Sequence, residues 1–349
     1  MLVLILLLLC NLVDMKVATT NNVHDNEPTS KDALNLASSW SKNFCGWNVV
    51  FPRMIEDTVA DSNKIFGMAT GTEYTIEKLV PFCKSVRLSG YRGSVLLGIS
   101  KLKGSAERKR NKMFKKYNIA SIYLDRVKGN EWSQSICRYH AYMQVVDHFA
   151  NENDSILITD VRDVIFQDDP FNSNPYGSMH FLNSSVNLLL FLEGLNDISK
   201  DRVTLANTAP NVRWITNIYS YKIFKSLGHN PPICSGTTIG KKSGMQYYLR
   251  SMLYQGYLCL KRNPKKYIKN RGHVCSGGAD QGFHNFLFWG NHLPEAISIE
   301  NGAGPVYTLG IFRGKPVRSL DFDQSEFGEI VSPAQRGPQF PIPLIHQWD

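Results

Sequence analysis

The stretch that decides the fold is Ser155-Ile-Leu-Ile-Thr-Asp-Val-Arg-Asp-Val-Ile-Phe166. Residues 155–159 form an apolar run with the length of a buried strand. Asp160 and Asp163 follow at the point where that strand ends. In open parallel sheets, ligands bind beyond the carboxyl ends of the strands. The turn after this strand is therefore the first candidate for a functional site.

Three segments before this stretch have the same short apolar character and predict further buried strands: Ile65–Gly71, Ser94–Ser100 and Ile119–Leu124. Apolar residues at helical spacing separate them, from Ile76 to Val86 and again in a helix that begins near Ser133. Strands that alternate with helices predict an α/β fold, in which helices flank a mostly parallel central sheet.

The composition is that of a globular protein. The chain has 349 residues, of which 43% are hydrophobic, so it can bury a large core. Glycine (26 residues) and proline (16 residues) are near average usage, which excludes a collagen-like or low-complexity chain. We find no internal repeat, which argues against a solenoid or a propeller. No linker follows Asn43, so we expect one domain over residues 43–349.

The formal net charge of +9 favours an anionic partner, such as a nucleotide, a nucleic acid, an acidic glycan or a membrane surface. Two basic clusters contribute to it, and both are interpreted as solvated faces. Neither contains interleaved aromatic residues or a nucleic-acid-binding module, so we expect no nucleic-acid partner. The clusters are Lys101, Lys103, Arg108, Lys109, Arg110, Lys112, Lys115 and Lys116, and Lys261, Arg262, Lys265, Lys266, Lys269 and Arg271.

The N-terminus predicts entry into the secretory pathway. Residues 1–20 contain an apolar run shorter than the roughly 20 residues of a membrane span. We interpret it as a signal peptide, with a short membrane anchor as the alternative. Residues 21–42 are polar and predict a stem or leader. Glycosylation triplets at Asn153 and Asn183 agree weakly with a lumenal location.

Six cysteines remain if Cys10 belongs to the leader, and six allow 15 pairings. No C-x-x-C spacing occurs, which disfavours a zinc ribbon. An oxidising lumen would favour disulfides, and Cys259 and Cys275, which flank a basic loop, are the best candidates for a pair. Cys83 and Cys137 lie on apolar helix faces and are predicted to be core residues.

Asp160 and Asp163 lie three residues apart at a strand end, so their carboxylates can converge on one divalent cation. Mg²⁺ and Mn²⁺ prefer oxygen ligands and leave positions open for phosphate oxygens. A metal-bound diphosphate is a better leaving group, because the metal neutralises the charge that develops on it. Arg162 adds a positive charge there or pairs with the acids. The alternative is an exposed turn with a local ion pair.

This segment, together with Pro170 and Phe171, resembles the metal-binding segment of GT-A fold nucleotide-sugar glycosyltransferases. Their usual spacing is Asp-x-Asp, whereas here it is Asp-x-x-Asp. Three further segments follow in the order that the family implies. They resemble a glycine-bearing loop beside donor and acceptor (Ile233–Gly240), an acidic motif at a helix start (Ala279-Asp280-Gln281) and a histidine that completes the metal site (Ile345-His346-Gln347).

The resemblance implies a GT-A (Rossmann-like) domain that binds Mn²⁺ or Mg²⁺ through Asp160, Asp163 and His346. It implies a catalytic role for Asp280 and Gln281, with Asp280 orienting the acceptor hydroxyl or taking its proton. Without the resemblance, Asp280 is equally well interpreted as a helix N-cap and His346 as an ordinary core histidine.

The donor in this family is a nucleotide-diphosphate sugar. Thr70, Gly71 and Tyr74 follow the first strand, where the base and ribose would lie. Gly236 allows close approach of the backbone, and Thr237 offers a hydroxyl. The other residues assigned to the donor are cationic. They are Arg162 and Arg138, and the latter faces the diphosphate or is an exposed helical charge.

These features predict a metal-dependent glycosyltransferase of the Golgi or ER lumen, which transfers a sugar to a hydroxyl of a glycan or glycoprotein. Through its N-terminus it would be membrane-anchored, or it would be secreted. The alternative is a catalytically inactive sugar-binding protein of the same fold. A metal phosphoesterase is a weaker reading, because the nine histidines are scattered. The residues do not specify the donor sugar, the acceptor, the linkage or the stereochemical outcome.

Overall fold

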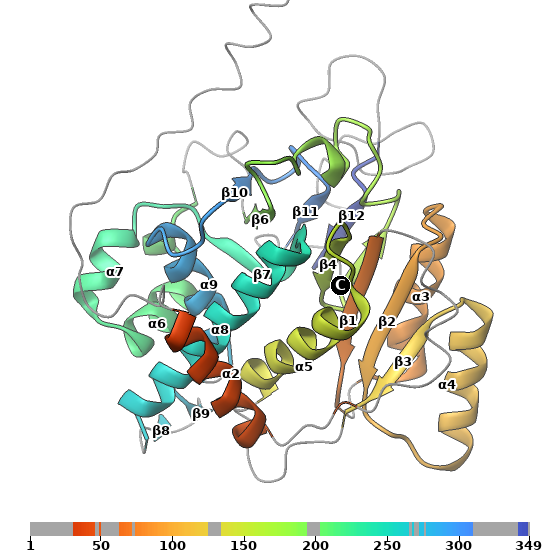
Figure 1. Cartoon of the computed structure of the whole chain (residues 1–349), viewed down its shortest axis with the longest axis horizontal. Coiled ribbons are helices and arrows are strands. Elements are labelled where there is room, and N and C mark those ends of the chain that lie inside the picture. The colour runs from red at the N-terminus through yellow and green to blue at the C-terminus, as the bar shows by residue number, and fades with distance from the viewer. Residues whose placement is uncertain are drawn as a thin grey trace, which may run out of the picture.

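The computed structural model describes residues 31–45, 49, 63–71, 74–124, 134–193, 203–264, 267–268, 272–275, 277–309 and 341–347. A seven-stranded sheet crosses its centre (Figure 1). In spatial order the strands are β10 (Ala296–Ile299), β6 (Leu188–Leu192), β7 (Ile233–Lys241), β4 (Ser155–Thr159), β1 (Asn63–Ala69), β2 (Ser94–Ile99) and β3 (Ala120–Tyr123).

Most neighbouring strands of this sheet are parallel, which confirms the predicted fold class. β1 pairs in parallel with β2 and with β4, β2 with β3, and β6 with β10. Only β7 runs antiparallel to its two neighbours, β4 and β6. The bounds of β4 coincide with the predicted strand, because its apolar run is bordered by polar residues on both sides. Residues 233–240, which resembled a glycine-bearing loop, belong to strand β7.

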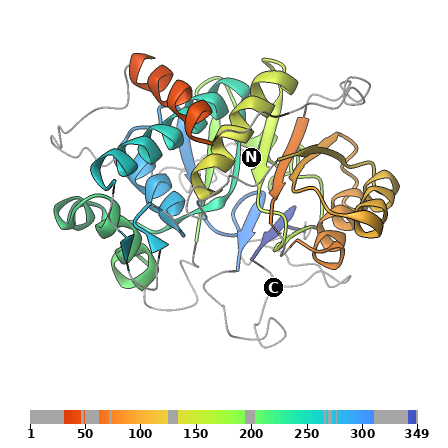
Figure 2. The same cartoon turned by 90° about the horizontal axis from the view of Figure 1, so that it is seen from below.

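Helices cover both faces of the sheet, because side chains alternate along each strand. On β1, Phe66 and Met68 face one hydrophobic cluster, whereas Ile65 and Ala69 face another. The first cluster includes residues of α2 (Lys31–Cys45), α5 (Gln134–Phe149), α8 (Lys242–Arg262) and α9 (Ala279–Trp289). The second includes residues of α3 (Ile76–Leu88) and α4 (Gly104–Lys116). Figure 2 shows α2 in red and α5 in yellow-green together on one side.

Further elements lie at the edges of this core. Helices α6 (Ala209–Ile218) and α7 (Tyr221–Leu227) contact each other, and α6 also packs on α9. A second sheet has the order β11 (Val306–Thr308), β12 (Leu344–His346) and β5 (Val164–Phe166). Strands β8 (Tyr267–Ile268) and β9 (Gly272–His273) form a small hairpin.

The polar stem predicted for residues 21–42 is wrong from residue 31 onward. Residues 31–45 form helix α2, which packs on α8 and α5. Leu34 is buried, and the hydroxyl of Ser41 hydrogen-bonds His140 at 2.9 Å. Sequence analysis missed this helix because its many polar residues obscured apolar ones that recur at helical spacing, among them Ala33, Ala37, Trp40 and Phe44. The predicted signal peptide or anchor, residues 1–20, lies outside the described residues.

Two disulfides link elements of the fold. Cys259 pairs with Cys275, as predicted. Cys45 pairs with Cys137 and ties α2 to α5, so the prediction that Cys137 is a plain core residue is wrong. An apolar helix face suits a half-cystine as well as a core thiol, and only the packing of α2 brings Cys45 there. Cys83 and Cys234 are buried free thiols.

The first basic cluster is exposed except at Arg110. Arg110 is buried; it donates to the carbonyl of Ser100 at 2.7 Å and pairs with Glu107. The prediction of a solvated face is therefore wrong for this residue, because its guanidinium ties α4 to the end of β2. Within the described ranges, no helix combines the length and apolarity that crossing a bilayer requires.

Candidate active site

Asp160 lies immediately beyond β4, and the neighbouring strand β7 holds its backbone. The N–H of Asp160 donates to the carbonyl of Gly236 at 2.7 Å. The pairing of β7 with β6 is irregular here, since Leu190 pairs with Thr238 but Phe191 pairs with Cys234. Such an irregularity redirects side chains at the end of a sheet. It brings the backbone of Gly236 against the start of the acidic turn.

Asp163 and His346 are brought together by strand pairing. Asp163 immediately precedes β5, and β5 pairs antiparallel with β12, so that Val164 lies opposite His346. The N–H of Gln347 donates to the carbonyl of Asp163 at 2.7 Å and extends the ladder by one bond. This ladder connects the acidic turn with the far C-terminal segment, which local sequence patterns could not show.

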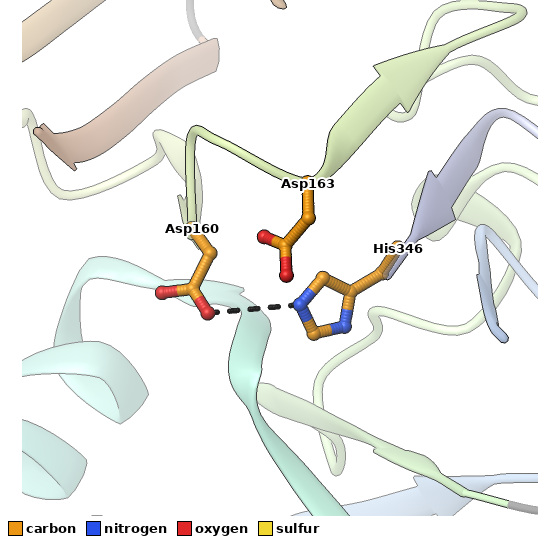
Figure 3. Close-up of side chains that lie close together, drawn as sticks. All are labelled: Asp160, Asp163 and His346. Atoms are coloured by element: carbon orange, nitrogen blue, oxygen red, sulfur yellow. Dashed lines mark ion pairs between the residues drawn. The ribbon is translucent and has the colours of Figure 1, made fainter. Parts of the chain in front are cut away.

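The side chains of Asp160, Asp163 and His346 converge (Figure 3). Each offers one ligand atom, and these atoms lie within 4.8 Å of one another. Oδ2 of Asp160 is 3.6 Å from Nε2 of His346. Burial raises the pKa of Asp160, but the neighbouring His346 and the charge of Arg138 outweigh burial, so the pKa lies below its usual value. Asp160 is therefore a carboxylate at neutral pH.

The residues present fit a divalent cation. His346 is fully buried, and its Nε2 has no hydrogen-bond partner. A Cβ at Gly236 would lie 2.6 Å from that nitrogen and 2.8 Å from Oδ2 of Asp160, so a side chain there would intrude between two of the ligands. Two carboxylates and one imidazole are ligands that Mn²⁺ accepts readily, and Mg²⁺ suits the carboxylates.

Arg138, on α5, connects this cluster to a third carboxylate. Its Nη1 donates to Oδ1 of Asp160 at 3.1 Å, and its Nη2 donates to Oδ2 of Asp280. Nη2 also donates to the hydroxyl of Tyr139 at 3.0 Å. Burial disfavours the charged guanidinium, but Tyr139 and the carboxylates outweigh it and raise the pKa of Arg138. The reading of Arg138 as an exposed helical charge is wrong, because only 18% of its side chain is exposed.

Asp280 and Gln281 occupy the first turn of α9, as predicted for an acidic motif at a helix start. The N-cap is Gly278, with φ of 84°, so the reading of Asp280 as a cap is wrong. Gln281 points to a different set of partners. Its Nε2 donates to Oε2 of Glu193 at 3.1 Å and to Oδ1 of Asn211 at 3.2 Å.

Of the three residues predicted to contact base and ribose, Tyr74 interacts electrostatically with the acidic turn. Burial raises the pKa of Tyr74, and the negative charge of Asp160 raises it further. Gly71 has φ of 128°, and its N–H donates to Oγ of Ser100 at 3.1 Å. Thr70 follows the carboxyl end of β1 and is half-buried. The three therefore lie beyond the carboxyl end of β1, the strand that pairs with β4.

Two further residues predicted to bind the donor are Thr237 and Arg162. Thr237 is fully buried in β7 opposite Thr159, and its hydroxyl has no hydrogen-bond partner. Arg162 pairs with Asp163, with Nη2 3.8 Å from Oδ2, and 41% of its side chain is exposed. Sequence analysis left both outcomes open for Arg162, and the ion pair is the one observed.

Sequence analysis missed Glu193 and Cys234. Glu193 follows β6 directly, and Cys234 lies in β7, with its Sγ 3.3 Å from Nδ1 of His346. A lone cysteine in an apolar strand carries no signal of its own. The segment after β6 did carry one, because polar residues at the carboxyl end of a strand are candidates for a site.

No family model and no curated protein matches the chain. Its fold is similar to solved structures of glycosyltransferases. The galactosyltransferase LgtC, in complex with donor and acceptor sugar analogs, is 11% identical with a TM-score of 0.44, over 81% of this chain and 86% of that one. The mannosyltransferase PcManGT from Pyrobaculum calidifontis, in complex with GDP-Man and Mn²⁺, is 12% identical with a TM-score of 0.34, over 77% and 63%. Similarity at this level identifies neither a reaction nor a substrate.

Proposed function

We propose that this protein is a metal-dependent glycosyltransferase, which moves a sugar from a nucleotide-diphosphate-sugar donor to an acceptor hydroxyl. The observation that carries the proposal is the meeting of Asp160, Asp163 and His346, with ligand atoms within 4.8 Å of one another, beyond the carboxyl end of β4. These residues come from two distant segments of the chain, so a local turn does not explain why they meet.

Asp160, Asp163 and His346 would hold Mn²⁺ or Mg²⁺. When bound, such an ion neutralises the charge that develops on the departing diphosphate. The two carboxylates lie next to each other, and without a counter-charge their repulsion destabilises the folded chain. Arg138 and Arg162 supply part of that counter-charge through their ion pairs. The remaining negative potential attracts a divalent cation.

The chain's own residues orient the reactants. Arg138 holds Asp160 and Asp280 at one guanidinium, so the metal-binding turn and the start of α9 keep a constant relative position. Positioning of this kind lowers the barrier by reducing the entropy lost on reaction. Asp280 would accept a hydrogen bond from the acceptor hydroxyl. In an inverting reaction it would take that proton as a general base.

We further propose that the protein acts on a glycan or glycoprotein in the Golgi or ER lumen. Two disulfides support this location, because such bonds persist in oxidising compartments. Asn153 and Asn183, the asparagines of the two glycosylation triplets, are both exposed. Membrane association through residues 1–20, or secretion after their removal, follows from the same proposal.

The test is a panel of nucleotide-diphosphate sugars, assayed for hydrolysis and transfer by the purified protein with Mn²⁺ and with EDTA. We expect at least one donor to turn over with Mn²⁺ and to stop with EDTA. Asp280→Asn should retain donor binding and lose most turnover. Glu152→Gln, an exposed acid remote from the site, is the matched control and should match the wild type.

The outcomes separate enzyme from binding protein. Donor binding without any turnover would favour the catalytically inactive sugar-binding protein. Turnover that persists in EDTA would contradict the metal dependence. Failure of every donor to bind, with or without Mn²⁺, would contradict the proposal as a whole.

A further inference from the structure

Cys234 is a buried free thiol whose sulfur faces the side of His346 opposite to the acidic cluster. Its Sγ lies 3.3 Å from Nδ1 of His346, whereas Nε2 of the same ring faces Asp160. The N–H of Gly236 donates to this sulfur at 3.5 Å. Cys234 therefore has two polar neighbours in a buried environment.

The contact between Cys234 and His346 allows two placements of the ring proton. If the S–H donated to Nδ1, the ring proton would lie on Nε2, which is buried and has no hydrogen-bond partner. If Nδ1–H donates to the sulfur, Nε2 has a bare lone pair that faces the carboxylates. The proposed metal site requires the second placement, because a metal binds the nitrogen that carries no proton.

We infer that Cys234 is a positioning residue that holds His346 in the Nδ1–H tautomer and so keeps Nε2 available for the metal. The inference rests on the proposed function for its purpose, since it assigns a role toward the same metal site. A hydrogen bond to the second ring nitrogen commonly sets which nitrogen of a histidine binds a metal.

The geometry argues against a direct role of the thiol as a ligand. Nδ1 and Nε2 lie on opposite edges of the imidazole ring, and the sulfur lies at the Nδ1 edge. The ligand atoms that converge come from Asp160, Asp163 and His346.

The first readout is the tautomer of His346 in metal-free protein. Nitrogen NMR of protein labelled with ¹⁵N-histidine distinguishes Nδ1–H from Nε2–H, and the His346→Asn spectrum assigns the resonance. We expect Nδ1–H in the wild type and in Cys234→Ser, whose hydroxyl also donates and accepts. In Cys234→Ala we expect Nε2–H, donated toward Asp160, or a mixture of both tautomers.

The second readout is the affinity for Mn²⁺ alone, measured from the electron paramagnetic resonance of the free ion. Cys234→Ala should bind Mn²⁺ about 10- to 100-fold more weakly, the usual effect of losing such a supporting hydrogen bond. Cys234→Ser should lie closer to the wild type. Cys83→Ala removes another buried free thiol, on α3, and should leave the affinity unchanged.

Nε2–H in the wild type would overturn the inference, and so would unchanged tautomer and affinity in Cys234→Ala. Either result would leave the proposed function standing, provided that the wild type binds Mn²⁺ and Asp160→Asn does not. If the two proteins bind Mn²⁺ equally weakly, the proposed metal site is wrong, and the tautomers alone then decide whether Cys234 orients His346.

Discussion

The two ends of strands β1 and β4 bury charge in opposite ways. At the amino end, Nζ of Lys64 lies 3.3 Å from Oδ2 of Asp154, and each side chain is 3% exposed or less. One cation meets one anion there. At the carboxyl end, Asp160 and Asp163 lie beside the imidazole of His346. Arg138 binds Asp160 and also a third carboxylate, that of Asp280.

The difference shows how buried charges that stabilise the fold can be distinguished from buried charges that bind a ligand. A closed ion pair has its solvation replaced within the protein and needs no further partner. A cluster with more carboxylates than cations, and with a buried nitrogen that has no partner, is incomplete without a ligand. The amino end therefore stabilises the fold, whereas the carboxyl end is where we propose that a cation binds.

The largest expected effect breaks the closed pair. Lys64→Met leaves Asp154 charged and buried, and should lower the free energy of unfolding by about 3–5 kcal/mol. Urea unfolding measures this loss. The double variant Lys64→Met/Asp154→Leu should recover much of it, because it removes both charges. A loss below about 1 kcal/mol in the single variant would mean that the pair is dispensable.

Asp163→Asn removes a charge at the carboxyl end, and we expect it to lower the activity rather than the stability. We expect turnover to fall by about 100- to 1,000-fold, because one metal ligand and its charge are lost. The free energy of unfolding without metal should change by less than about 1 kcal/mol, since the change also relieves repulsion with Asp160. A strongly unfolded variant with normal turnover per folded chain would contradict the comparison.

Gly236→Ala tests the close approach of β7 to the cluster. Its Cβ would lie 2.6 Å from Nε2 of His346 and 2.8 Å from Asp160, so we expect Mn²⁺ to bind about 10- to 100-fold more weakly. Gly98→Ala, in β2, is the matched control, since its Cβ meets the flexible side chain of Leu124 at 2.6 Å. Calorimetric titration with Mn²⁺ should show normal affinity in the control. Equal affinity for Mn²⁺ in both variants would contradict the inference that position 236 must lack a side chain.

The most gradual expected effect concerns His284, which lies on α9, one helical turn after Asp280. Burial lowers the pKa of His284 to about 3, from an ordinary value near 6.5. The unfolded chain therefore binds the proton first, and stability is full above pH 6.5 and falls as the pH drops toward 3. This group contributes a slope of up to about 1.4 kcal/mol per pH unit in that window.

Urea unfolding at several pH values between 7 and 4 measures that slope. His284→Gln removes the titrating ring and should give a shallower dependence, even if the variant is less stable at pH 7. His148→Gln, on α5, serves as the control histidine and should keep the wild-type slope. A slope in His284→Gln as steep as in the wild type would show that His284 is not the group that titrates.

Sequence analysis predicted those parts of the fold whose pattern of apolar and polar residues is complete within one short segment. β4 was predicted residue by residue, and β1, β2 and β3 were located within a few residues, because a buried strand is an apolar run between polar borders. Helix α2 was missed, because polar residues outnumber the apolar ones that recur at helical spacing in residues 31–45. Its amphipathic pattern was present in the sequence, whereas its packing on α5 and α8 was not.

The same division runs through the candidate site. Asp160 and Asp163 stand out in the sequence because they follow an apolar strand, and Asp280 stands out at a helix start. His346 carried no signal of its own, and only its resemblance to a family motif singled it out. The contacts of Arg138 with two carboxylates and of Cys234 with His346 could not be predicted, because they join segments far apart in the chain.

The sequence by itself determined most of the central strands and which carboxylates stand at their ends, since a buried strand shows in the local pattern of apolar and polar residues. Only the tertiary structure decided which distant segments meet: the pairing of β5 with β12, the irregularity of β7 at Gly236 and the disulfide between Cys45 and Cys137. Strand register and helix packing depend on the fit of surfaces from the whole chain, and no single segment contains that information.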